Sequence, residues 1–145
     1  MQQLFKVLFL SFLFIGFNVK AADDLMTFDF NSVVERGYAE GILDENIHFI
    51  LKGNTNPAID KNFGEFATNK KTNGFGKSDK ESCDWALLSA LKQLQAKAQS
   101  MEADYVINII SNFKSKEYQD SEQYQCGAGF LMSGVALKAD IVRSK

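Results

Sequence analysis

The sequence is poor in several residues that metal and catalytic sites use. Its 145 residues include one histidine, two cysteines, one proline and one tryptophan. One histidine and two cysteines provide few ligands of the kinds that hold zinc. Sixteen basic and 18 acidic residues give a net charge of −2, so there is no basic excess for a nucleic-acid backbone. We therefore expect a globular chain with no cofactor and no nucleic-acid partner.

The one extended hydrophobic run lies near the N-terminus and is short. Residues 7–17 are mostly apolar, whereas a transmembrane helix needs about 20 apolar residues. Lys6 precedes this run, and Val19 and Ala21 follow it at the positions that a signal peptidase recognises. This layout is typical of a secretory signal peptide, which we predict over residues 1–21. A retained membrane anchor or a buried helix is the alternative interpretation, and no later segment predicts a transmembrane span.

Cleavage near Ala21 leaves residues 22–145, a length that fits a single domain in the periplasm or outside the cell. Both cysteines, Cys83 and Cys126, lie in this part. Disulfides persist in oxidising compartments, and two cysteines allow one intramolecular pairing. The bridge would close a loop of about 43 residues and remove roughly 4 kcal/mol of unfolded-state entropy. The alternative is a pair of free or metal-binding thiols, but a metal would need more ligands and His48 is the only histidine.

Local patterns predict one short helix and two strands in the first half of the domain. Asn31 or Ser32 can cap a helix, Glu35 stands three residues after Ser32 as in a capping box, and the apolar residues after Ser32 share one helical side. We expect this helix over residues 32–40. Residues 46–52 and 63–72 predict strands, separated by a loop that holds the only proline.

The clearest element is a long helix from Ser78 to about Met101. Ser78 and Glu81 form a second capping-box pattern, which satisfies free N–H groups where a helix begins. Apolar residues recur at three- and four-residue steps along one stripe: Cys83, Leu87, Ala90, Leu94, Ala98 and Met101. Beyond the helix, residues 105–112 predict a strand, and residues 124–142 predict one long strand, straight or bulged.

Small residues in the last strand indicate a close neighbour. Gly127, Gly129 and Gly134 are typical of bends or of close backbone approach, and a helix resting on this strand would need such positions. The elements together predict an α/β (α+β) domain, in which a small, mostly antiparallel sheet packs against one long helix. Their order is α-β-β-α-β-β, with one disulfide between the first turns of the long helix and the strand that contains Cys126.

One segment resembles a nucleotide-binding motif. Residues 74–78, GFGKS, match the end of a P-loop and are followed by a helix. However, Lys71 stands where the motif begins with glycine, and Asp79 and Glu81 already occupy the positive end of the helix. The basic residues around this loop are either a solvated charge run or a docking surface for an anionic partner. They are Lys70, Lys71, Lys77 and Lys80.

Three segments between residues 68 and 142 carry a resemblance to known proteins: TNKKTNGFGKSDKESCDWALLSALKQLQAKA, ADYVINIISNFKS and YQCGAGFLMSGVALKADIV. They resemble a group of small exported bacterial proteins of unknown function that are often described as excinuclease ABC proteins or excinuclease ATPase subunits. True excinuclease subunits are far longer and have complete nucleotide-binding and zinc motifs, so we expect no such ATPase activity here. More distantly, the pattern is similar to the YbjQ-like fold and to the Rcs stress-sensing outer-membrane lipoprotein. That similarity implies a small sheet against one long helix and no particular reaction.

No catalytic constellation is recognisable in the sequence. His48 lies among apolar residues with no evident partner for general-base chemistry, which indicates a structural role. We predict an exported, non-enzymatic binding or interaction protein with a link to envelope stress, whose partner is a protein or an envelope component. The alternatives are a small periplasmic enzyme with an unrecognised site and a protein that binds divalent metal.

Overall fold

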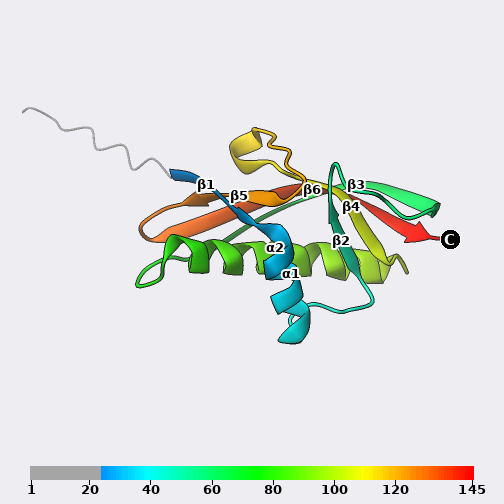
Figure 1. The fold of residues 1–145 in the computed structure, drawn as a ribbon, viewed down its shortest axis with the longest axis horizontal. Coiled ribbons are helices and arrows are strands. Elements are labelled where there is room, and N and C mark those ends of the chain that lie inside the picture. Colours follow the sequence, from blue (N-terminus) through cyan, green and yellow to red (C-terminus); the bar gives the residue numbers. More distant parts are fainter. Residues whose placement is uncertain (1–23) are drawn as a thin grey trace, which may run out of the picture.

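Six strands and two α-helices make up the part of the chain that the computed structural model describes, residues 24–145 (Figure 1). The predicted signal peptide, residues 1–21, and its cleavage point lie outside the described residues. In chain order the elements are β1 (Asp24–Asp29), α1 (Phe30–Ala39), β2 (His48–Leu51), β3 (Ile59–Asn73), α2 (Asp79–Ser100), β4 (Tyr105–Ser111), the 3₁₀ turn η1 (Phe113–Ser115), β5 (Gln123–Ala128) and β6 (Met132–Ser144).

Strand β6 is the centre of a curled, mixed sheet (Figure 1). Along one edge it pairs antiparallel with β3, from Met132 to Ser144. Its other edge is shared, because β5 pairs with its beginning and β4 with its later part. Outside these, β1 pairs antiparallel with β5, and β2 pairs parallel with β4. The prediction of a mostly antiparallel sheet is thus confirmed, and the sheet splits where β4 and β5 separate.

Helix α2 covers one face of this sheet (Figure 1). Its start is capped by Ser78, whose side-chain oxygen accepts a hydrogen bond from the Glu81 N–H. The buried stripe of α2 packs on alternate residues of β6, which point to the same face of the strand. The fully buried members of this core include Leu87, Leu91 and Leu94 of the helix and Val135, Leu137 and Ile141 of the strand. The predicted layer of one long helix on a sheet is therefore confirmed.

The disulfide joins the two layers. Cys83 in the first turns of α2 is bonded to Cys126 in β5, with the two Cα atoms 5.9 Å apart. Both residues are fully buried. This confirms the predicted pairing and leaves no free cysteine. None of the helices in residues 24–145 is both long and apolar enough to cross a membrane.

Two parts of the predicted element order are wrong. A strand, β1, precedes the first helix, and the expected long strand over residues 124–142 is a hairpin of β5 and β6 that turns at residues 129–131. Residues 24–29 have too little apolar alternation to indicate a strand by themselves, and their pairing with β5 decides their conformation. The apolar residues at the hairpin turn hide it, because turns usually carry glycine, asparagine, aspartate or serine.

Candidate interaction surface

Helix α2 leaves the other face of the sheet uncovered. Neighbouring residues of a strand point to opposite faces, so Gly134 faces away from α2 because Val135 belongs to the core beneath the helix. Residues paired across two strands share a face, which places Lys71 beside Gly134 and Asn69 beside Ala136. We call this surface the open face.

The ring of Phe113 packs on the open face where the sheet splits. Phe113 is 8% exposed, although it lies outside the core beneath α2. A Cβ atom on Gly127 would stand 2.1 Å from the Cζ atom of Phe113, and one on Gly134 would stand 3.2 Å from its Cε2 atom. The ring therefore requires glycine at position 127 and leaves little room for a larger residue at position 134. The close approach that the sequence indicated is real, but an aromatic side chain makes it, and not a helix.

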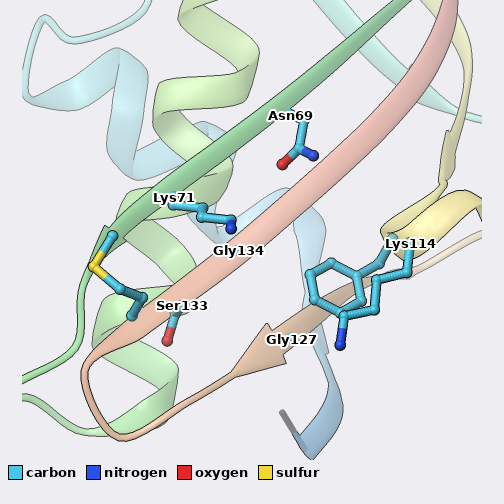
Figure 2. Close-up of a pocket in the computed structure, with 8 residues that line it drawn as sticks. Asn69, Lys71, Lys114, Gly127, Ser133 and Gly134 are labelled. Carbon is cyan, nitrogen blue, oxygen red and sulfur yellow. The ribbon is translucent and has the colours of Figure 1, made fainter. Parts of the chain in front are cut away.

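A groove of about 160 Å³ runs beside Phe113 on the open face (Figure 2). Its apolar part consists of the Phe113 ring, Met132 and the two glycines, and its polar side chains are those of Asn69, Lys71 and Lys114; Ser133 borders the groove, but its hydroxyl is bonded to Ser82 on the helix side. Figure 2 shows Lys71 extending from β3 across β6 toward Gly134, with Lys114 on the far side of the groove. An apolar floor beside the Lys71 ammonium group is suited to a ligand that carries a negative charge on an apolar body.

Other features of the open face lie on both sides of this groove. A second hollow of about 120 Å³ lies on the other side of Phe113, against Leu25, Lys114 and Lys116. Farther along β6, Lys138 donates to Glu117 at 3.0 Å. This hydrogen bond and the Glu117 charge raise the pKa of Lys138. The positive charge of Lys138 is therefore balanced by the Glu117 carboxylate. Lys71 has no ion pair with any of residues 24–145, so its charge is available in the groove.

The four predicted lysines do not form one cluster. Lys71 lies in the groove, whereas its neighbour Lys70 points to the helix side of β3. Lys77 lies in the turn before α2 and has no ion pair among the described residues. Lys80 lies in the first turn of α2 and is bonded to Asp84, with 2.6 Å between Nζ and Oδ2. Of these four lysines, only Lys71 therefore lines the open-face groove.

Asp84 is the centre of a buried polar cluster beneath the helix side of the sheet. Its side chain is 2% exposed and accepts a hydrogen bond of 2.7 Å from the Tyr124 hydroxyl. Burial, then the hydrogen bond and charge of Asp84, raise the pKa of Tyr124. Lys80 and Arg36 supply the opposing positive charge, at 2.6 and 3.6 Å from Oδ2. Through its contacts with Arg36, Lys80 and Tyr124, Asp84 connects α1, α2 and β5 and has a structural role.

The segment that resembles a P-loop is a turn. Residues 74–78 connect β3 to α2, with Gly76 at a φ of +73°. At the start of α2, the Glu81 N–H already donates to the Ser78 hydroxyl, so this N–H group is not available to a phosphate. The Gly74 N–H donates to the Leu131 carbonyl at 2.8 Å, which attaches the turn to the β5–β6 hairpin.

His48 lies apart from the grooves described above. It is exposed at the beginning of β2, and its ring is 4.7 Å from the Tyr105 ring. Nearby, partial burial acts to raise the pKa of Asp104, but hydrogen bonds from Ser144 outweigh it and hold that pKa below its ordinary value. Within residues 24–145, no three histidine, cysteine, aspartate or glutamate side chains are grouped closely enough to hold a metal ion.

Sequence patterns missed Phe113, Asn69 and Lys114. Their positions depend on the split between β4 and β5 and on η1, neither of which has a sequence signature. The glycines at 127 and 134 are the one available signal, because they indicate that something lies against the strand. No protein-family model, curated protein or solved structure matches the chain.

Proposed function

We propose that the protein is an exported, non-enzymatic binding protein, and that the open-face groove receives a negatively charged group of a protein or of an envelope component. The observation that carries this proposal is the position of Lys71. Its ammonium group lies over an apolar floor opposite Lys114 and has no ion pair within the described residues. Apolar walls with a few convergent polar groups are the usual composition of binding sites.

The rest of the domain supports a binding role outside the cytosol. The Cys83–Cys126 bridge fits an oxidising compartment, where disulfides persist. The bridge and the Asp84 cluster hold the sheet against α2, so that the open face is presented by a rigid support. A groove on a rigid sheet loses little conformational entropy when a ligand binds. The predicted link to envelope stress is part of this proposal.

Titration with small anions, followed by amide NMR, tests the groove directly. Inorganic phosphate and acetate serve as probes of the two anionic groups most common in proteins and envelope components. We expect saturable shifts at Asn69, Lys71 and Gly134, and loss of these shifts in Lys71→Glu. The matched control is Lys92→Glu on the exposed side of α2, which should leave the shifts unchanged.

The proposal fails if neither anion perturbs the groove, or if Lys71→Glu and Lys92→Glu behave alike. Because Lys71 is exposed, its substitution should change the free energy of unfolding by less than about 0.5 kcal/mol, so a lost shift would not reflect unfolding. Weak shifts spread evenly over all lysines would indicate general charge screening and would also contradict a defined site.

A further inference from the structure

Four large apolar side chains are exposed at one end of the molecule, on two neighbouring loops. Phe75, in the turn between β3 and α2, is 63% exposed, and Phe130, Leu131 and Met132, at the β5–β6 turn, are 81%, 61% and 47% exposed. The rings of Phe75 and Phe130 meet edge to face, with centroids 5.9 Å apart. The hydrogen bond from Gly74 to Leu131 joins the two loops. We call these four residues the apolar tip.

This composition is unusual for a turn. Turns favour glycine, asparagine, aspartate and serine, which tolerate the required backbone angles and remain hydrated. In this turn, the large apolar side chains of Phe130 and Leu131 are instead exposed, and the rest of residues 24–145 leaves most of their surface uncovered. Contiguous exposed apolar groups of this kind mark contact sites.

The charges next to the tip indicate what it contacts. Lys77 is two residues after Phe75 in the same loop and has no ion pair among the described residues. The nearest acidic residues along the chain, Asp79 and Glu81, lie in the first turn of α2, where the positive end of the helix offsets their charge. The tip thus combines apolar side chains with an available ammonium group.

The tip also lies at the end of the molecule where the chain enters the fold. Asp24, the first residue of β1, pairs with Ala128, immediately before the β5–β6 turn. Figure 1 shows the beginning of β1, that turn and the β3–α2 loop at the same end. The first described residues of the chain therefore lie beside the tip.

We propose that the apolar tip inserts into the surface of a membrane that contains anionic lipids. The tip consists of two convex loops, which can enter the boundary between headgroups and acyl chains without requiring a complementary cavity in a partner. Phe75, Phe130 and Leu131 enter that boundary, and Lys77 stays at the level of the anionic headgroups. Met132 belongs to both the tip and the groove, but the three side chains that enter the membrane do not line the groove, so this contact does not depend on the ligand bound there.

Co-sedimentation with lipid vesicles tests the proposal. The purified protein is mixed with vesicles of equal parts phosphatidylglycerol and phosphatidylcholine, and with vesicles of phosphatidylcholine alone. We expect binding to the anionic vesicles that weakens with added salt, and a loss of roughly tenfold in Phe130→Ser/Leu131→Ser, because two large apolar side chains no longer leave water. Lys77→Glu should weaken binding to the anionic vesicles and have little effect on the neutral ones.

The matched control is Ile59→Ser, which removes another exposed apolar side chain at the start of β3, away from the tip. It should bind as the unaltered protein does. All variants share the same N-terminal segment, so a difference between them reports on the tip. A second measurement uses Trp85→Phe/Phe130→Trp, whose tip fluorescence should shift to the blue when anionic vesicles are added.

The proposal is overturned if Phe130→Ser/Leu131→Ser sediments as the unaltered protein does, or if no vesicle binding occurs. Self-association that is lost in this variant, without vesicle binding, would assign the tip to a contact between copies instead. A protein cross-linked at the tip in the absence of vesicle binding would likewise overturn it. The phosphate shifts at Lys71 should persist in every tip variant, so failure of the tip and failure of the groove are distinguishable.

Discussion

The two faces of the sheet differ in how their polar groups are used. On the helix side, the polar groups near the disulfide are paired with one another: Tyr124 bonds to Asp84, and Ser82 and Ser133 share a hydrogen bond of 2.6 Å between their hydroxyls. On the open face, Lys71 has no partner among residues 24–145 and lies over glycine and phenylalanine. We infer that stability is concentrated beneath α2, whereas the open face keeps the Lys71 charge available for a ligand. Four predictions test this division.

The largest expected effect comes from removing the disulfide. Cys83→Ser/Cys126→Ser should lower the free energy of unfolding by about 2–5 kcal/mol, because a long loop of the unfolded chain is no longer closed. Urea unfolding measures the loss. Reduction of the unaltered protein should cause a similar loss, and reductant should have no effect on the double variant. A loss below about 1 kcal/mol would show that the helix side does not depend on the bridge.

Tyr124→Phe should have the next largest effect. Asp84 would lose a hydrogen bond in a site where water cannot replace it, which costs about 1.5–3 kcal/mol for a charged acceptor. Tyr118→Phe is the matched control, since Tyr118 also bonds to a carboxylate, Asp120, at 3.3 Å but is partly exposed. We expect the control to change stability by less than about 0.5 kcal/mol. Equal losses in the two variants would contradict the proposed difference between the sites.

Gly127→Ala tests the packing of the open face. The new methyl group would overlap the Phe113 ring, and relieving the overlap should cost about 1–3 kcal/mol. Gly134→Ala, whose Cβ would stand 3.2 Å from the same ring, should cost less. In a Phe113→Ala background the penalty of Gly127→Ala should largely disappear, which a double-mutant cycle measures. A penalty that persists there would locate the strain elsewhere.

The smallest expected effect is a pH dependence at the junction of α1 and β2. The Tyr38 hydroxyl donates to the Ile47 carbonyl at 2.6 Å, and burial, aided by the charges of Asp44 and Glu45, raises its pKa to about 12. The folded protein therefore keeps this proton at pH values where the unfolded chain, with an ordinary pKa near 10, has released it. Its contribution to stability is complete below pH 10 and declines as the pH rises toward about 12.

Urea unfolding of the unaltered protein and of Tyr38→Phe, between pH 9 and 12, measures this contribution. We expect a shallower alkaline decline in the variant. All other groups are the same in the two proteins, so the difference between their pH profiles reports on Tyr38. Identical pH profiles would mean that Tyr38 does not titrate differently in the folded and unfolded states.

Sequence patterns predicted the elements whose signals are local. The α2 helix has an apolar stripe at helical spacing and a Ser78 cap, and it begins and ends within a residue of the expected positions. The β3 strand was shorter in the prediction than in the structure, because its first residues are polar and form a strand by pairing with β6. The hairpin of β5 and β6 was hidden, since Phe130 and Leu131 occupy its turn.

The candidate site was only partly predictable. Lys71 was singled out with three other lysines, but the alternation of the strand sends Lys70 to the opposite face, and Asp84 binds Lys80. Phe113 and Asn69 meet Lys71 through the pairing of β3 with β6 and through the turn after β4. Such contacts join residues that are far apart in sequence, so no local pattern encodes them.

The amino-acid sequence alone is enough to predict the long helix, the β-rich remainder and the single possible pairing of Cys83 with Cys126. These follow from periodicity, capping and the count of cysteines, all of which act over short stretches or on the whole composition. By contrast, the split in the sheet, the ring of Phe113 that fills it and the open face are evident only in the folded domain. Strand pairing and burial are set by which distant segments meet, and that choice depends on the packing of the complete domain.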